Sequence, residues 1–316
     1  MDADQSGTTR LEVSEIGDYL VSAAIGSVTS EVKKVSISAD GETKNVTLSF
    51  ISVNVTTATG ALVTATLNNS EYSTIAENGT AEFYLPSKGN WNINASSGTL
   101  NNAEVVPITE YATYDSFVPL YDTVFSNNSW SDIQKATQTG LASSYWEVGD
   151  SKAVILNGGV DGLNFNNETY YVYILGFDHN SIYEGRNTLH LAFGKTNSGV
   201  QIAFKGFPMN TAVAANSWES SSMRIDLCSR FLELLPEDLR SVITPAKKYT
   251  QNNGEVTMTS DAIWLLSSYE VMGQIGAANA GEANCQQQYA YYENGNSRIR
   301  NGHIENQQAI SWWLRS

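Results

Sequence analysis

The sequence predicts an α+β protein in which an N-terminal β-sandwich precedes a second domain of mixed helices and strands. From Lys33 to Ala95, apolar and polar residues alternate in short runs separated by turn residues, which is typical of paired strands. The pattern changes near Trp130, where a helical spacing of apolar residues begins. A length of 316 residues makes two domains the default expectation.

The composition limits the classes of partner. Apolar residues make up 41% of the chain and charged residues only 16%, which predicts packed cores under a surface of hydroxyl and amide groups. The formal net charge is −15, and a negative field of this size repels nucleic-acid phosphates. No apolar run reaches the length of a transmembrane helix, and the N-terminus lacks the pattern of a signal peptide. We therefore expect no nucleic-acid partner, no membrane insertion and no signal peptide in this sequence.

Residues 1–30 form a weakly patterned N-terminal segment, and residues 31–100 are predicted to be the sandwich. The expected strands of the sandwich are 46–50, 51–55, 61–67, 81–86 and 91–95. Thr59–Thr66, Asn78–Pro86 and Lys88–Ala95 resemble the small Ig-like and carboxypeptidase-regulatory-like domains of bacterial surface and phage tail proteins. The resemblance implies a spacer that presents another domain and carries no chemistry.

Residues 101–144 are predicted to be a connector. Pro107 and Pro119, interspersed with tyrosines, indicate loops with aromatic anchors. The segment from Trp130 to Gly140 predicts a short helix, with Ser131 or Asp132 as the N-cap and Gly140 as the stop.

The second domain is expected to span residues 145–316. Its predicted strands are 154–156, 170–177, 190–194, 201–204 and 246–250, with a turn at 157–159, and its predicted helices are 223–235 and 283–292. Ala309–Ser316 looks like a buried strand, and Ala262–Ser267 is the nearest candidate for its neighbour. Because no turn or polar tail follows Trp312-Trp313-Leu314-Arg315-Ser316, we expect the domain to be C-terminally incomplete and to gain stability from further strands.

Five blocks in order carry a resemblance for this second domain. They are Trp218–Arg224, Lys248–Thr250, Ile263–Glu270, Tyr289–Arg298 and Trp312–Ser316. In this order they resemble domain of unknown function 6273, a family common in gut Firmicutes and in their phages and prophages. More loosely, the family is similar to the C-type-lectin and formylglycine-generating-enzyme fold. That similarity implies two main helices on a small twisted antiparallel sheet, with loops that form the binding surface.

The resemblance directs attention to side chains in the fourth block as binding residues. Tyr289, Tyr291 and Tyr292, with Asn296 and Arg298, offer rings for stacking and groups for hydrogen bonds to a sugar. The alternative is that the tyrosines are core anchors, since Tyr289 and Tyr292 would share one helix face. Tyr291 is the better candidate for an exposed ring. The residues expected in the structural core are Trp264, Leu265, Trp312, Trp313, Leu227 and Phe231.

The densest polar cluster is Asp178-His179-Asn180 with Glu184, Arg186 and His190. These residue types suit a metal or acid–base site, but the favoured interpretation is a solvated loop between two strands. We therefore expect no catalytic residue, no metal and no cofactor.

Two further pairs of residues are expected to be structural. Arg224 and Arg315 lie in otherwise apolar blocks, and each is expected to meet a carboxylate such as Glu270 or to cap a carbonyl. Cys228 and Cys285 are expected to be free, buried thiols, although a single disulfide stays open.

These expectations favour a non-enzymatic adhesion or host-recognition protein, namely a phage or prophage tail or head-fibre component located in the virion or outside the cell. The expected partners are a cell-surface glycan or protein receptor and, through the N-terminal part, other virion or surface proteins. A bacterial surface adhesin is the alternative in the same class, and homo-oligomerisation stays open. An enzyme that uses Asp178, His179 and His190 is the alternative from a different class.

Overall fold

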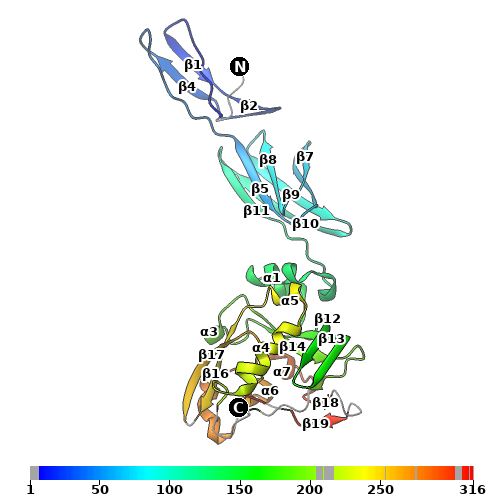
Figure 1. Cartoon of the computed structure of the whole chain (residues 1–316). Coiled ribbons are helices and arrows are strands. Elements are labelled where there is room, and N and C mark those ends of the chain that lie inside the picture. Colours follow the sequence, from blue (N-terminus) through cyan, green and yellow to red (C-terminus); the bar gives the residue numbers. More distant parts are fainter. Residues whose placement is uncertain are drawn as a thin grey trace. The chain divides into compact units, whose positions relative to one another are not determined.

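The chain divides into two compact units, Met1–Leu120 and Tyr121–Ser316. The structure is a computed structural model that describes residues 7–203, 209, 217–252, 254–274, 276–302, 308–312 and 314–315. Strands form the first unit, and all the helices of the described residues belong to the second, where they accompany further strands (Figure 1). None of the helices within the described ranges has the length and apolar character that a membrane span requires.

The N-terminal unit is built from strands alone. β1 (Gly17–Val21) pairs with β4 (Lys33–Ile37), and β2 (Ala24–Ile25) pairs with β3 (Val28–Thr29). A four-stranded sheet follows in the order β10 (Leu100–Ile108), β9 (Gly89–Ser97), β6 (Leu62–Leu67) and β7 (Ser70–Ile75). A three-stranded sheet has the order β11 (Thr113–Phe117), β5 (Ile51–Thr56) and β8 (Thr80–Leu85).

Alternation of side chains explains why these strands pair into sheets with one buried face. Val53 and Val55 in β5 and Val63 in β6 have no exposed surface, whereas the residues between them in β5 and β6 are more exposed. The buried faces of both sheets contribute to one hydrophobic cluster. Trp91 lies in this cluster with no exposed surface, and its indole Nε1 donates a hydrogen bond of 2.9 Å to the carbonyl oxygen of Ser87.

The boundaries of this unit differ from those predicted. The segment assigned to a connector contains β10 and β11, which complete the two sheets, so the unit extends to Leu120. β10 was not predicted because it is an edge strand, in which only Val106 and Ile108 are buried and most of the remaining residues are polar or exposed. The predicted strand at residues 46–50 is wrong, because that segment has no strand assignment and β5 begins at Ile51.

The C-terminal unit contains three small sheets. The largest is antiparallel and has the order β12 (Ser151–Val160), β13 (Leu163–Phe177) and β14 (Leu189–Lys195). β16 (Ala246–Asn252) pairs with β17 (Glu255–Asp261), and β15 (Ile202–Ala203), β18 (Arg300–Gly302) and β19 (Ala309–Ile310) form the third sheet. Strands predicted at 154–156, 170–177 and 190–194 fall within the first sheet and are confirmed.

The turn between β12 and β13 lies later than predicted. Val160 pairs with Leu163, so the loop is Asp161-Gly162, and both residues have positive φ, 45° and 83°. A two-residue hairpin loop requires this conformation, which Asp and Gly tolerate. The predicted turn at 157–159 instead contains a shift in strand register next to Gly158.

The helices of the C-terminal unit are short. They are η1 (Phe125–Asn127), α1 (Trp130–Gln138), α2 (Ala142–Tyr145), α3 (Ser181–Glu184), η2 (Met223–Cys228), α4 (Ser229–Leu234), α5 (Glu237–Arg240), α6 (Ser268–Met272), η3 (Ala277–Asn284) and α7 (Ala290–Glu293). The predicted helix 223–235 is confirmed as η2 followed directly by α4. The predicted helix at 130–140 is confirmed as α1, but its N-cap is Ser129, whose side chain accepts a hydrogen bond from the backbone N–H of Asp132.

The last third of the chain departs most from the sequence prediction. The predicted helix 283–292 is wrong: η3 ends at Asn284 and α7 begins at Ala290, because Tyr289 has an extended backbone and donates its N–H to the carbonyl oxygen of Glu270. Ala262–Ser267 is not a strand, and among residues 309–312, 314 and 315, which the structure describes, only β19 is. One backbone hydrogen bond of 2.8 Å still joins the two segments, from the N–H of Arg315 to the carbonyl oxygen of Leu266.

Gly194 in β14 provides a local test of this fold. Its φ is 103°, and a Cβ added there would lie 2.7 Å from the carbonyl oxygen of Ile202, a backbone atom that cannot move aside cheaply. We expect Gly194→Ala to lower the free energy of unfolding of the C-terminal unit by about 1–3 kcal/mol. Gly276→Ala is the control, because Gly276 has no positive φ and no atom within 4 Å of an added Cβ. Equal stability of the two variants in urea denaturation would contradict the described register near Gly194.

Candidate functional site

The tyrosines considered for sugar binding are core residues. Tyr289, Tyr291 and Tyr292 have exposed fractions of 0%, 3% and 1%, so the prediction that Tyr291 is exposed is wrong. The reason lies in β13: the ring of Tyr291 packs 4.8 Å from that of Tyr173, and its hydroxyl accepts a 2.6 Å hydrogen bond from Gln201 Nε2. The alternative expectation, that these three tyrosines are core anchors, is correct.

The two polar residues predicted beside these tyrosines hold the backbone together. Asn296 Nδ2 donates to the carbonyl oxygen of Tyr291 at 2.8 Å, and Arg298 Nε donates to the carbonyl oxygen of Val271 at 3.0 Å. Both side chains are half-buried, so their polar groups stabilise the turn after α7. This contact set does not support the expected role in ligand binding.

The residues predicted for the structural core are only partly enclosed. Trp264, Leu265, Trp312, Leu227 and Phe231 are half-buried, and each packs against a cluster of fully buried side chains. Trp313 lies outside the described residues. All five of the described residues also line a cavity, which explains why they are not fully enclosed.

Four charged side chains meet in the interior of the C-terminal unit, and we call them the buried charge cluster. They are Glu184 of α3, Lys248 of β16, Glu270 of α6 and Arg315 near the C-terminal end. The side chains of Lys248, Glu270 and Arg315 have no exposed surface, and that of Glu184 is 2% exposed. Two carboxylates and two cations balance in charge, which lowers the cost of burying them.

Glu270 lies at the centre of this cluster. Arg315 donates to both of its carboxylate oxygens, at 2.8 Å from Nη1 and 3.0 Å from Nη2, and Lys248 Nζ donates at 3.1 Å. The same carboxylate accepts the backbone N–H of Ser267 in the capping box of α6. The predicted pairing of Arg315 with Glu270 is confirmed, and Arg224 likewise meets a carboxylate, with its Nε 2.6 Å from Asp261 Oδ1.

Aromatic side chains enclose the buried charge cluster. The Tyr289 hydroxyl lies 3.0 Å from Lys248 Nζ and 2.9 Å from His190 Nδ1. The imidazole of His179 stacks on the Tyr289 ring with centroids 3.7 Å apart, and Lys248 Nζ lies 4.5 Å from the centre of the Trp264 ring. The aromatic rings thus surround the charged groups of the cluster, which contact one another.

The prediction of a solvated loop at residues 178–190 is therefore only partly correct. Asp178 and Arg186 are exposed, but His179 and His190 are 5% and 4% exposed, and the carboxylate of Glu184 is buried. The loop turns inward because Asp178 Oδ1 accepts the backbone N–H of Thr188, which closes the turn, and Asn180 Nδ2 donates to the carbonyl oxygen of Cys285.

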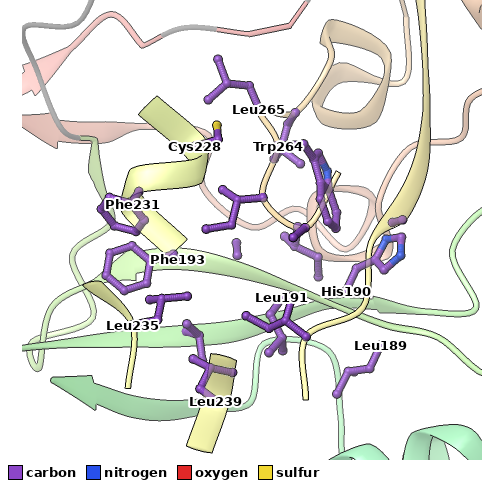
Figure 2. A pocket seen from close by; sticks show the side chains of 18 of the residues that line it. Leu189, His190, Leu191, Phe193, Cys228, Phe231, Leu235, Leu239, Trp264 and Leu265 are labelled. Carbon is purple, nitrogen blue, oxygen red and sulfur yellow. The ribbon is translucent and has the colours of Figure 1, made fainter. Parts of the chain in front are cut away.

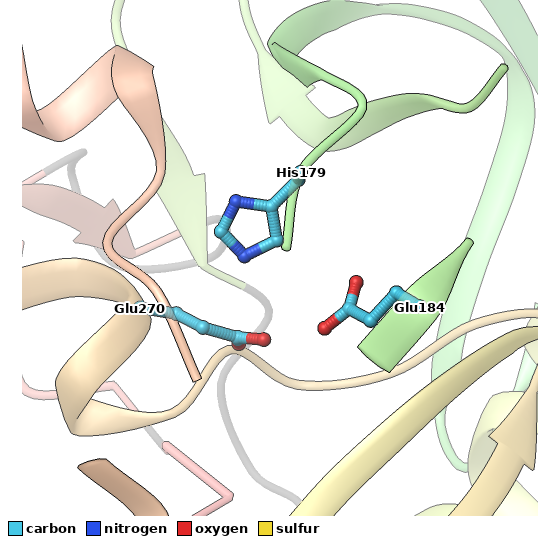
Figure 3. Close-up of side chains that lie close together, drawn as sticks. All are labelled: His179, Glu184 and Glu270. Atoms are coloured by element: carbon cyan, nitrogen blue, oxygen red, sulfur yellow. The ribbon is translucent and has the colours of Figure 1, made fainter. Parts of the chain in front are cut away.

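Three members of this region have the residue types of a metal site (Figure 3). The ligand atoms of His179, Glu184 and Glu270 lie within 4.8 Å of one another. The ammonium of Lys248, however, lies 3.0 Å from Glu184 and 3.1 Å from Glu270, so it already supplies the positive charge that the carboxylates require. We assign no metal to this site.

Burial changes the titration of the two histidines. It lowers the pKa of His179 to about 3 against the opposing pull of Glu270, and it lowers the pKa of His190 well below its ordinary value. Burial also raises the pKa of Glu184 to about 7, against the effect of Lys248. The histidines are thus neutral in the folded protein at neutral pH.

These shifts predict a pH dependence of stability. Below pH 6.5, His179 is protonated in the unfolded chain but stays neutral in the folded protein. Its contribution to the stability of the folded state therefore falls as the pH falls toward 3. Glu184 acts in the opposite direction, because its raised pKa favours folding most below 4.5 and this contribution is lost as the pH rises through about 7. Because the two contributions oppose each other, the effect of His179 is measured as the difference in the free energy of unfolding between the wild type and His179→Phe. Phenylalanine keeps an aromatic ring in place to stack on Tyr289.

Between pH 6.5 and pH 4.5 we expect the wild type to lose stability relative to His179→Phe by up to about 1.4 kcal/mol per pH unit. Urea denaturation of both proteins across this range measures the difference. Parallel curves for the two proteins would show that His179 titrates normally in the folded state.

A cavity of about 510 Å³ adjoins the buried charge cluster. Its wall includes Leu189, Leu191 and Phe193 of β14, Cys228 and Phe231 on the helical segment η2–α4, and Trp264 (Figure 2). Glu184 and His190 line it from the side of the charge cluster, and Arg300 lines it together with Trp312. A largely apolar cavity with a few polar groups is the usual form of a small-molecule site.

The two cysteines are free and buried, as predicted. Burial raises the pKa of the Cys228 thiol to about 12, and it raises the pKa of the Cys285 thiol as well. Thiols in this state are poor nucleophiles, so the presence of Cys228 in the cavity wall does not indicate cysteine chemistry.

Lys248 is the important residue whose role sequence reasoning missed, whereas Glu184 was named in the group at residues 178–190 but was expected to lie in a solvated loop. Lys248 lies inside the correctly predicted strand 246–250, where a lysine ordinarily faces solvent. The alternation of side chains along the strand could have indicated its burial, since Lys248 and Thr250 share one face of β16 and both are buried.

Comparison with known proteins gives one match, to a family model. No curated protein matches the chain, and no solved structure matches it, so the Ig-like and C-type-lectin-like arrangements stay predictions. All five of the blocks that carried the resemblance fall within the matched range of 201–316, whereas residues 145–200 of the predicted second domain lie outside it. Residues 201–316 match the model of the family DUF6273, a domain of unknown function.

Proposed function

We propose that this chain is a non-enzymatic recognition protein, in which the N-terminal unit is a spacer and the C-terminal unit binds a receptor on a bacterial cell surface. The proposed setting is a phage or prophage tail or head fibre, in the virion or outside the cell. A bacterial surface adhesin is the alternative setting for the same activity.

The observation that carries this proposal is the internal pairing of the buried charge cluster. Glu184 and Glu270 are neutralised by Lys248 and Arg315 at distances of 2.8–3.1 Å, within the side-chain core. Glu270, which both cations hold, stabilises the fold and is poorly placed to exchange a proton with a substrate. The separate hydrophobic cluster of each unit further supports a spacer joined to a binding domain.

The enzyme alternative has less support from the same geometry. An acid–base role for Asp178, His179 and His190 requires that they face a common space, yet Asp178 is exposed and accepts a hydrogen bond within its own turn. His190 Nδ1 is engaged by the Tyr289 hydroxyl, and the His179 ring is covered by the Tyr289 ring. We therefore propose that these histidines are structural.

Binding of the whole chain to cells tests the proposal. Fluorescently labelled protein is incubated with a panel of gut Firmicutes and with glycan arrays, each with and without a chelator. The matched competitor is the isolated N-terminal unit, Met1–Leu120, which has its own hydrophobic cluster. We expect saturable binding by the whole chain that neither the N-terminal unit nor the chelator abolishes.

Two results would overturn the proposal. The first is equal binding by the N-terminal unit alone, which would place recognition outside the C-terminal unit. The second is turnover of a substrate that is lost in the His179→Ala, His190→Ala double variant while the variant still melts cooperatively. Tail or holin genes beside this gene would favour the virion setting, and a sortase gene would favour the adhesin.

A further inference from the structure

We propose that the cavity of the C-terminal unit binds an amphiphilic monocarboxylate, with its apolar chain between β14 and the η2–α4 segment and its carboxylate at Arg300. This inference goes beyond the proposed function, because it concerns an internal ligand and does not require binding to cells. It depends on the lining of the cavity and on the unsatisfied state of one buried cation.

The lining selects an apolar ligand body. Most of the side chains around the 510 Å³ space are aliphatic or aromatic, and they come from elements far apart in the sequence: β14, η2, α4, α5 and the segment 262–266. Figure 2 shows Leu191, Phe231 and Leu235 among the side chains gathered around it. A sugar would find few hydrogen-bond partners on such a wall, whereas an alkyl chain would bury its whole length.

The charged residues of the wall select the head group. The described lining contains four ionisable side chains, namely the thiol of Cys228 and the side chains of Glu184, His190 and Arg300. Glu184 is paired with Lys248, and His190 Nδ1 is engaged by Tyr289. Arg300 differs from both, since no carboxylate of the described residues lies within ion-pair distance of its guanidinium.

Arg300 is buried and incompletely bonded. It is 6% exposed, its Nη2 donates to the Tyr292 hydroxyl at 2.7 Å, and its Nη1 has no hydrogen-bond partner. The guanidinium carbon lies 5.0 Å from the centre of the Trp312 ring, another residue of the cavity wall. A buried cation without a counter-ion is costly, and an anion bound beside it would remove that cost.

A second donor lies close to this guanidinium. The hydroxyl of Tyr173 is buried without a hydrogen-bond partner. Burial raises the pKa of Tyr173 far above its ordinary value, with Arg300 acting in the opposite direction, so the hydroxyl keeps its proton and can donate it in a hydrogen bond. Because Tyr173 is not among the residues that line the cavity, the head group is assigned to the unpartnered guanidinium nitrogen of Arg300, whose single charge suits a monoanion.

Saturated carboxylates of increasing length test this assignment on the whole chain. Titration calorimetry compares octanoate, dodecanoate and hexadecanoate with the alcohols of the same lengths, below their aggregation concentrations. We expect one site, affinity that rises with chain length, and carboxylates that bind at least about tenfold more tightly than the matched alcohols.

Variants separate the head-group contact from the chain contact. Arg300→Leu should remove the preference for carboxylate over alcohol, and Arg300→Lys should restore part of it because the charge returns. Leu191→Trp should fill the cavity and weaken both ligand types by at least about tenfold. The exposed Arg230→Leu is the matched control for removal of an arginine, and it should leave both affinities unchanged.

Thermal melting of each variant shows which ones fold. If Arg300→Leu does not fold, Arg300→Lys still tests the assignment. Absence of saturable binding by the wild type would overturn the proposal. So would equal affinity for matched carboxylates and alcohols, or an unchanged carboxylate preference in both Arg300 variants. None of these outcomes bears on cell binding, so failure here leaves the proposed receptor recognition to its own test.

Discussion

Replacing Glu270 with glutamine should lower the free energy of unfolding of the C-terminal unit by about 3–5 kcal/mol. Burial alone would raise the pKa of Glu270, but Arg315 and Lys248 outweigh burial and hold that pKa well below its ordinary range. Glutamine keeps the shape of the side chain and removes its charge, so Arg315 loses both of its ionic hydrogen bonds and stays buried. Urea denaturation followed by tryptophan fluorescence measures the loss.

Arg230→Gln is the matched control for breaking an ion pair. Arg230 contacts Asp161 at 2.6 Å and Asp226 at 2.8 Å, but its side chain is 41% exposed. We expect a much smaller loss than for Glu270→Gln, because water screens exposed pairs. Similar losses for the two variants would mean that the buried charge cluster contributes no more than a surface pair does.

Replacing Trp91 with alanine should destabilise the N-terminal unit by about 3–5 kcal/mol. Trp91 has no exposed surface in the cluster between the two sheets, and its removal leaves a cavity and an unpaired carbonyl at Ser87. Because the chain divides into two compact units, we expect two unfolding transitions, of which only one shifts. Differential scanning calorimetry of the whole chain resolves them.

Val105→Ala provides the comparison in the same unit. Val105 lies in β10 with 58% of its surface exposed, and its truncation should change stability by less than about 0.5 kcal/mol. If Trp91→Ala shifted every transition equally, the two units would unfold as one, and the division at Leu120 would not describe their stability.

Several local features could be predicted because they depend on neighbouring residues in the sequence. β13 and β14 follow from runs of strand-forming residues, and the helical segment ending at Leu234 follows from its apolar spacing and from Pro236. The pairing of Arg315 with a carboxylate was also predicted, since an arginine in an apolar block requires an anionic partner. Each of these predictions uses information within one segment, or a requirement that one residue carries with it.

Edge strands and segments without regular structure could not be predicted in the same way. β10 has few buried residues, so its pairing with β9 decides its conformation. Ala262–Ser267 has the composition of a strand but lies along the cavity without strand partners, because Trp264 and Leu265 pack against side chains from other segments. The extended backbone at Tyr289 likewise results from its hydrogen bond to Glu270.

The sequence by itself determined the β-rich N-terminal unit, the main sheet of the C-terminal unit and the match of residues 201–316 to the DUF6273 model. Only the tertiary structure decided that Lys248 and Glu184 join Glu270 and Arg315, and that Arg300 lines a cavity without a carboxylate partner among the described residues. The physical reason is separation along the chain. Coulomb interactions and desolvation depend on distances in space, and no pattern within one segment records which charges the fold brings together.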